Sequence, residues 1–226
     1  MIQHKVPTIS QRKKKFAASS NRGNDLPTRE LSDMHCSSQD LMAWQEHPFY
    51  LPCLPAFGSG ITDCPCTIHN HDLLQTTVPE AIVQTDIHDH YFAEPVDTDR
   101  YQAIAIGPGL GQEEDTALAM MEQIQGCPVP LVLDADAINI FGTHRNWLSR
   151  MPKRCILTPH LKELERLIGK CMDTYERLTK TKELAAYLQS YIIIKGSWST
   201  VVTPEGNCYF NPTGNPGMAT AAAVMC

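Results

Sequence analysis

Five groups of polar or glycine residues could do chemistry, and each follows a short apolar stretch. They are the glycines of residues 107–111, the pair Asp134 and Asp136, His160 with Glu163, the segment 195–199, and the segment 213–220. Glycines let backbone N–H groups approach a ligand, an imidazole exchanges a proton near neutral pH, and the Lys195 ammonium can face phosphate. Each group also has an ordinary alternative: a tight turn for the glycines, a helix cap for the aspartates and His160, and a strand end for Lys195.

The segment 211–220, Asn-Pro-Thr-Gly-Asn-Pro-Gly-Met-Ala-Thr, alternates proline and glycine at Pro212, Gly214, Pro216 and Gly217. Such a composition cannot continue a strand or a helix, so it predicts a tight turn with backbone N–H groups free to face a ligand. Loops of this kind often open an anion-binding helix N-terminus. An ordinary surface turn is the alternative.

Apolar stretches alternate with amphipathic ones from His71 onward. We expect a strand entered through 79–83 and strands at 101–106, 129–133, 155–157 and 191–194, helices at about 113–125, 161–168 and 175–188, and a hairpin formed by 199–203 and 208–210. This alternation predicts an α/β fold with a mostly parallel central sheet and helices on both faces. Because ligands bind outside the carboxyl ends of such strands, the five groups are expected to form one site.

The composition indicates one globular domain rather than a nucleic-acid or membrane protein. The chain has 226 residues, 42% of them hydrophobic, and a net charge of −6, with a short basic run at 12–15. The negative charge argues against nucleic acid as the main partner. No window approaches the roughly 18 apolar residues of a membrane span, and residues 1–15 lack an apolar signal core, so we expect a cytoplasmic protein with no membrane partner.

The nine cysteines are scattered, which does not suggest a disulfide framework. Cys53, Cys64, Cys66, His69 and His71 form a cluster that could suggest zinc. Their spacing matches neither C-x₂-C nor H-x₃-H, so no metal ligand is assigned.

Residues 1–67 show no convincing strand or helix, because prolines at 27, 48, 52, 55 and 65 interrupt the sequence and apolar periodicity is poor. We expect this segment to be out of frame or disordered, and residues 68–226 to form the folded domain.

The motif series GPGLG, LDADAIN, LTPHLKELERL, IIIKGSWSTVV and NPTGNPGMAT resembles that of the ADP-dependent NAD(P)H-hydrate dehydratases, which have a ribokinase-like fold. The resemblance covers about residues 68–220, and related kinases of this fold do not share the whole series. It implies an enzyme, a hydro-lyase: ADP phosphorylates the hydroxyl of the 6S hydrate of NADH or NADPH, with Mg²⁺, and phosphate is then eliminated to repair the cofactor. It also implies a homo-oligomer.

The resemblance assigns roles to residues at matching motif positions. Substrate binding falls to Gly109 and His160. Nucleotide binding falls to Lys195, Gly196, Ser197, Trp198 and Ser199, with Gly111, Asp134, Asp136, Asn215 and Gly217 as the supporting loops. This sequence departs from the family pattern in three places: Lys162 replaces a glycine, Ser199 replaces a threonine, and no G-G-S-G-D run follows Thr220. Because that run supplies the anion hole and the general-base aspartate, no catalytic residue is intact in the chain as written.

Shifted reading frames offer one explanation for both unusual ends. The last six residues, 221–226, can be written in codons that encode G-G-S-G-D-V once a single G is placed before them. Residues 26–50 and 51–66, each read in a shifted frame, can encode SHKGTFGHALLIAGSYGMAGASIL and CRACLRSGAGLLTVHV, which are good versions of the family's first two strands. We therefore expect the domain to lack its C-terminal part and the chain as written to be impaired. A genuine divergent extension is the alternative.

Two other functions stay open at this point. One is a small-molecule kinase of the same fold, acting on a vitamin precursor. The other is a catalytically dead nucleotide-binding protein, or the product of a pseudogene.

Overall fold

A single sheet with a mostly parallel core runs through the computed structural model, which describes residues 40–43 and 61–212 except 78, 80 and 100. Its strand order is β3-β2-β1-β4-β5-β6-β7-β8-β9, with every neighbouring pair parallel up to β7 and antiparallel pairs at β7–β8 and β8–β9. The strands are β1 Asp40–Ala43, β2 Ile61–Cys66, β3 Ile82–Thr85, β4 Ala103–Ile106, β5 Leu131–Leu133, β6 Ile156–Leu157, β7 Tyr191–Ile194, β8 Ser199–Val202 and β9 Cys208–Asn211. All described residues belong to the compact unit Cys36–Cys226.

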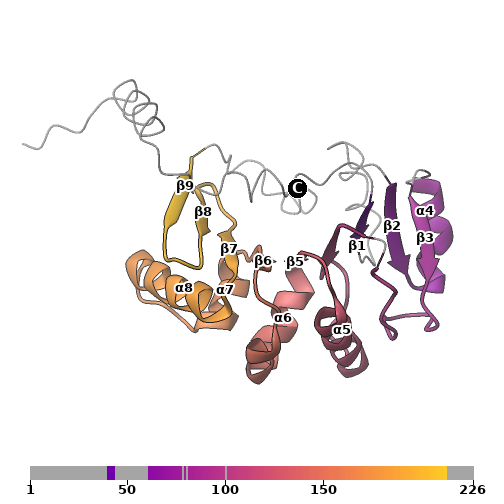
Figure 1. Ribbon diagram of the computed structural model, residues 1–226, viewed down its shortest axis with the longest axis horizontal. Coiled ribbons are helices and arrows are strands. Elements are labelled where there is room, and N and C mark those ends of the chain that lie inside the picture. Colours follow the sequence, from indigo (N-terminus) through magenta and orange to yellow (C-terminus); the bar gives the residue numbers. More distant parts are fainter. Residues whose placement is uncertain (1–39, 44–60, 78, 80, 100, 213–226) are drawn as a thin grey trace, which may run out of the picture. The chain divides into compact units, whose positions relative to one another are not determined.

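The face of the sheet on which each helix lies follows from the direction in which consecutive strands are added. From β4 to β7 the sheet grows one way and from β2 to β3 it grows the other, so right-handed crossovers place the intervening helices on opposite faces. The helices are α4 His71–Thr77, α5 Glu114–Gly126, α6 Ala135–Thr143, α7 Leu161–Ile168 and α8 Thr174–Leu188, with 3₁₀ turns at Ile68–Asn70 and Arg145–Arg150. Figure 1 shows α5 to α8 in one row and α4 apart from them beside β2 and β3. The predicted fold class is confirmed.

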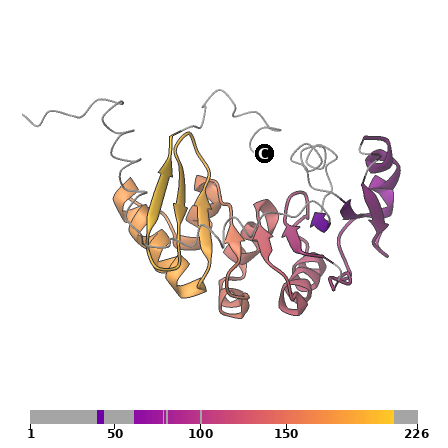
Figure 2. The ribbon, with the colours of Figure 1, turned by 45° about the horizontal axis from the view of Figure 1, so that its top comes forward.

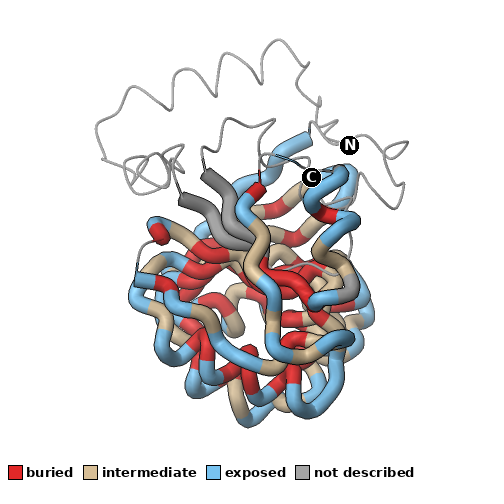
Figure 3. Tube along the Cα trace, turned by 90° about the vertical axis from the view of Figure 1, so that its right-hand side faces the viewer, coloured by how far each residue is buried: buried red, intermediate tan, exposed pale blue. Residues whose placement is uncertain are grey.

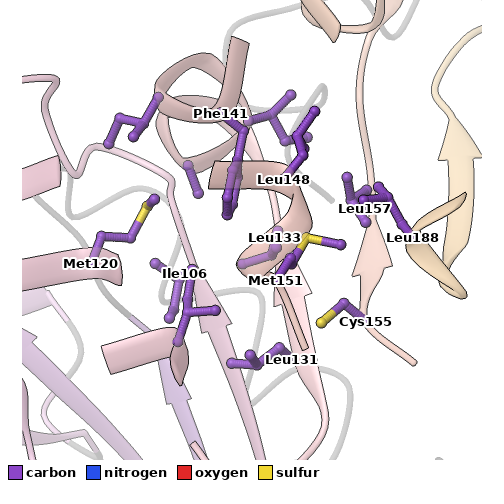
Figure 4. Close-up of a cluster of buried hydrophobic side chains, with 14 of the residues drawn as sticks. Ile106, Met120, Leu131, Leu133, Phe141, Leu148, Met151, Cys155, Leu157 and Leu188 are labelled. Carbon is purple, nitrogen blue, oxygen red and sulfur yellow. The ribbon is translucent and has the colours of Figure 1, made fainter. Parts of the chain in front are cut away.

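The core lies between the strands and the row of helices. Leu133 and Leu157 point from the sheet at Phe141 of α6 and Leu188 of α8, and all are buried or nearly so (Figure 4). Burying one such side chain stabilises the fold by about 1.5–3 kcal/mol. Figure 3 shows buried residues concentrated along the strands, with exposed residues on the outer turns of the chain.

The end of the sheet after β7 is a hairpin in which β8 alternates between buried and partly exposed residues and β9 is mostly exposed. Val202 is fully buried on β8, whereas Tyr209 and Phe210 on β9 are exposed. β9 pairs only with β8 among the described strands, and Figure 2 shows the two, in yellow, beside β7. The predicted hairpin is therefore confirmed.

Two strands lie where the sequence predicted none. β1 pairs with β2 and β4, and β2 pairs with β3, so both are inner strands of the sheet. Local sequence did not reveal them because Asp63 and Pro65 are residue types that strands disfavour, and pairing with neighbours overrides that preference. The expectation of no strand before residue 68 is wrong for 40–43 and 61–66. The rest of residues 1–60 lies outside the described residues.

Candidate functional site

A glycine loop leaves β4 at the point where the strand order reverses, which is where α/β sheets open a crevice for ligands. Gly107, Gly109 and Gly111 have φ angles of +132°, +67° and +82°, a region that favours glycine. A Cβ added at Gly107 would lie 1.8 Å from the backbone oxygen of Asp134. The loop therefore packs directly on the turn that follows β5, and only glycine fits there.

The Asp136 carboxylate holds this glycine loop in place. Its Oδ2 accepts a hydrogen bond from the Gly111 N–H at 3.2 Å, and its Oδ1 accepts from Gln112 Nε2 at 2.8 Å and from Asn139 Nδ2 at 3.1 Å. Asn139 Oδ1 in turn accepts a hydrogen bond from the guanidinium of Arg166 on α7. A chain of side-chain contacts thus runs from the glycine loop through α6 to α7.

Asp134 makes a different connection. It is the N-cap residue of α6, yet its side chain makes no capping hydrogen bond. Instead Oδ1 lies 2.6 Å from Lys195 Nζ, with the aspartate side chain 7% and the lysine side chain 24% exposed. Of the two alternatives left open by the sequence, the contact with Lys195 rather than a cap explains this aspartate. The pair joins the ends of β5 and β7 across β6.

His160 caps α7, as one of the two sequence interpretations predicted. Its Nδ1 accepts hydrogen bonds from the N–H groups of Lys162 and Glu163, while Glu163 Oε2 accepts from the His160 N–H at 2.8 Å. Because Nδ1 accepts two bonds, the neutral ring carries its proton on Nε2, which lies 3.1 Å from Glu163 Oε1. The capping box therefore fixes both the orientation and the tautomer of the imidazole.

Glu163 is a buried carboxyl beside three charged or titratable groups. Burial raises the pKa of Glu163, and the hydrogen bond from the His160 N–H and the charges of His160 and Lys195 offset part of that rise. The Asp134 charge acts in the same direction as burial. The Glu163 carboxyl thus lies within the electrostatic influence of the Asp134–Lys195 pair at the carboxyl ends of β5, β6 and β7.

The segment 195–199 leaves β7 and turns into β8. The Lys195 N–H donates to Pro159 O at 2.9 Å, next to His160, and Ser199 Oγ donates to Gly196 O at 3.3 Å. Gly196 and Ser197 are exposed, and the Trp198 indole is 63% exposed although it is a large aromatic side chain. The segment therefore presents backbone, hydroxyl groups and an aromatic ring at the same edge as His160.

The structure brings together most of the residues singled out in the sequence. Gly111 contacts Asp136, Asp134 contacts Lys195, and the Lys195 backbone contacts the residue before His160. Asn215 and Gly217 lie outside the described residues. Sequence reasoning singled out Glu163 beside His160 but missed Gln112, Asn139 and Arg166, although the i, i+3 spacing of Asp136 and Asn139 is a signal that could have found one of them.

No three His, Cys, Asp or Glu side chains in the described part of the chain are grouped so that they could hold a metal ion. No helix there has the length and apolar character needed to cross a membrane.

A family model described as NAD(P)H-hydrate dehydratase matches residues 53–223 of this chain. Among curated relatives, the ADP-dependent (S)-NAD(P)H-hydrate dehydratase of Bacillus subtilis is 39% identical over 124 residues, covering 53% of this chain and 42% of the relative. A bifunctional NAD(P)H-hydrate repair enzyme of Thermofilum pendens is 36% identical over 122 residues, covering 53% of this chain and 23% of the relative. The chain thus spans less than half the length of these relatives.

Solved structures give the same picture. The ADP/ATP-dependent NAD(P)H-hydrate dehydratase of Bacillus subtilis, co-crystallised with ATP and Mg²⁺ and soaked with CoA, matches with a TM-score of 0.64 and 28% identity, covering 83% of this chain and 70% of that one. A ribokinase-like superfamily protein of Enterococcus faecalis V583 matches with a TM-score of 0.69 and 22% identity, covering 91% and 73%. The second likeness shows the fold alone.

Proposed function

Because the chain belongs to the NAD(P)H-hydrate dehydratase family, we propose that it serves the ADP-dependent dehydration of the 6S hydrate of NADH or NADPH. In this reaction ADP phosphorylates the hydroxyl of the hydrate, and loss of phosphate restores the cofactor. The observation that carries the proposal is the contact between Lys195 and Asp134, which joins the segment 195–199 to the turn that holds the glycine loop. Two binding loops at one edge of the sheet are what a two-substrate reaction needs.

On the substrate side we assign Gly109 and His160 to the hydrated nicotinamide nucleotide. Gly109 has no side chain and a φ of +67°, so a ligand can approach the main chain of this loop closely. The His160 ring is about two-fifths exposed while its other edge is held by the α7 backbone. A ring fixed in this way can orient a polar group of the substrate without itself being the general base.

On the nucleotide side we assign Lys195, Gly196, Ser197, Trp198 and Ser199 to ADP. The Lys195 ammonium can bind a phosphate as a point charge, and the glycine and serines beside it offer N–H and O–H donors. The exposed Trp198 indole offers a face on which a base can stack. Each contribution matches one part of an adenine nucleotide.

The family implies Mg²⁺, but the Asp134 and Glu163 carboxylates at this edge already have partners. Asp134 Oδ1 lies 2.6 Å from Lys195 Nζ, and Glu163 contacts His160 through both carboxylate oxygens. The ion would therefore be held mainly by the phosphates of the nucleotide and by water. When bound, Mg²⁺ would neutralise charge that develops on the phosphoryl group.

The test is an assay of hydrate dehydration, followed through recovery of the near-ultraviolet absorbance of the dihydronicotinamide ring. It compares the chain as written with a version in which the three shifted frames are restored, so that G-G-S-G-D follows Thr220 (the extended version), each with ADP and Mg²⁺. We expect the extended version to turn over and the given chain to be slower by at least the ~10²–10⁴ typical of a missing general base. No turnover by either version would refute the proposal, and phosphorylation of a vitamin-precursor alcohol by ATP would establish the kinase alternative.

Variants of the extended version test the residue assignments. His160→Ala should weaken hydrate binding and leave ADP binding nearly intact, and Lys195→Met should do the reverse. Lys153→Met is the matched control, because Lys153 is an exposed lysine that precedes β6 at the opposite edge of the sheet. A loss of ADP affinity in His160→Ala without loss of hydrate affinity would mean that the two roles are reversed.

A further inference from the structure

The turn Asp134-Ala135-Asp136 sends its two carboxylates to two different loops. Asp134 Oδ1 lies 2.6 Å from Lys195 Nζ, and Asp136 Oδ2 accepts the Gly111 N–H at 3.2 Å. Each contact ties down a loop that carries residues assigned to a different ligand, and only Ala135 separates the two aspartates. Movement of either loop therefore acts on the same three-residue turn.

The turn cannot absorb such movement locally. Its backbone is bonded to the end of β4, through Asp134 N–H to Ile106 O at 3.0 Å and Asp136 N–H to Gly107 O at 3.2 Å. Behind it α6 is anchored by Ala137, Ile138 and Phe141, all fully buried. A closely packed element of this kind shifts as a unit rather than bending residue by residue.

The Asp134–Lys195 contact is sensitive to ligands because it is largely buried. A phosphate that draws the Lys195 ammonium away would leave Asp134 as an unpaired buried carboxylate, which is strongly unfavourable. A small shift of the turn that moves the Asp134 carboxylate towards solvent, or towards the polar groups around Glu163, relieves that penalty. Such a shift would carry Asp136 with it and release the Gly111 N–H.

We propose that the turn 134–136 couples the two halves of the site, so that occupation of the segment 195–199 changes the hold on the glycine loop and the reverse. Asp134 and Asp136 are then positioning residues, acting through Lys195 and Gly111. By linkage, each ligand must change the affinity of the other by the same factor, and coupling of this kind is typically about 5–150-fold. The ligand identities rest on the proposed function, whereas the mechanical coupling between the loops does not.

The first experiment needs no ligand. Lys195→Met removes the ammonium, and we expect amide hydrogen exchange in 107–112 to become at least about fivefold faster, with no change in Lys153→Met. The double variant Asp134→Asn/Lys195→Met also removes the unpaired charge that drives the shift, so exchange in 107–112 should return towards that of the unsubstituted chain. Unchanged exchange in 107–112, or faster exchange throughout that the double variant does not reverse, would overturn the coupling.

The second experiment uses ADP and the hydrate of NADPH as probes on the extended chain. ADP affinity is measured with and without saturating hydrate, and hydrate affinity with and without ADP. We expect the affinity of each ligand to change by the same factor when the other is bound. This coupling factor should fall to near one in Asp134→Asn. The control Asp173→Asn, at the cap of α8, should leave it unchanged. A full coupling factor in Asp134→Asn overturns the inference. Failure of the unsubstituted chain to bind either probe overturns the proposed function instead, and the exchange experiment still decides the coupling.

Discussion

The close approach of Gly107 to Asp134 gives a severe test of the site's geometry. In Gly107→Ala the new Cβ would lie 1.8 Å from Asp134 O, 2.8 Å from Asp134 C and 2.9 Å from Ala137 Cβ. Two of these atoms are backbone, so a rotamer change cannot make room. In addition, a φ of +132° is a conformation that alanine rarely adopts.

The expected loss of stability follows from two terms. Holding a non-glycine residue in such a conformation costs about 1–3 kcal/mol, and forcing atoms into a packed region costs about 1–3 kcal/mol more. A total of about 4 kcal/mol corresponds to a fall in Tm of roughly 8–16 °C for a chain of this size. The substitution should also release the glycine loop, because it displaces Asp134 and Ala137, which flank the Asp136 that binds Gly111.

The matched control is Gly126→Ala at the end of α5, where an added Cβ would meet no atom within 4 Å. That change should be neutral or stabilise by up to about 1 kcal/mol. Both variants are compared by urea unfolding, followed by circular dichroism, with the slope checked for two-state behaviour. If Gly107→Ala unfolds within about 1 kcal/mol of Gly126→Ala, the packing of the glycine loop against the β5–α6 turn is wrong.

Three further predictions test single side chains. Burial raises the pKa of Glu163 in the folded protein above its value in the unfolded chain. Unfolding therefore releases a proton over the pH range just above about 4. As a result, the free energy of unfolding falls as pH rises through that range. Glu163→Gln should flatten this part of the stability curve and Glu165→Gln should not; identical curves for the two variants would contradict the assignment. Burial raises the pKa of the Cys155 thiol to about 12, so iodoacetamide should alkylate the half-buried Cys171 before Cys155. Equal alkylation rates of the two thiols by mass spectrometry would count against a buried Cys155. Trp198→Ala should weaken ADP binding by about 1–3 kcal/mol, or roughly 5–150-fold, while Trp198→Phe keeps most of the affinity, and equal losses would argue against stacking.

Elements with a clear apolar pattern were predictable from the sequence. β7, Tyr191–Ile194, and α7, Leu161–Ile168, have the predicted bounds, and α8 begins one residue earlier than expected. These elements have one buried face and recognisable boundaries, so local sequence carries most of the information. The helix α6 was not predicted. It is only nine residues long, it follows directly on the buried strand β5, and Asp136, Asn139 and Thr143 are its only polar residues, so its sequence gives a weak helix pattern.

The site was predictable as a set of loops but not as a set of contacts. Strand ends in a parallel sheet share one edge, which was enough to group the glycines, the aspartates, His160 and Lys195. The partner of Lys195 is 61 residues away, and a single sequence gives no signal for a pair at that separation. The two aspartates look alike in the sequence, yet one holds an ammonium and the other a backbone N–H. That difference arises only from the turn between β5 and α6.

β2 is the element in which sequence and structure disagree most. It lies between β1 and β3, so both of its edges are paired, and yet it contains Asp63 and Pro65. Proline lacks the N–H that an inner strand uses, and aspartate is among the residues least suited to strands. Read in the shifted frame, these same six positions can encode L-L-T-V-H-V, which is rich in the branched residues that inner parallel strands favour. The position of β2 within the sheet and the composition of the shifted reading therefore point to one explanation, in which the fold requires a strand here that the residues as written do not favour.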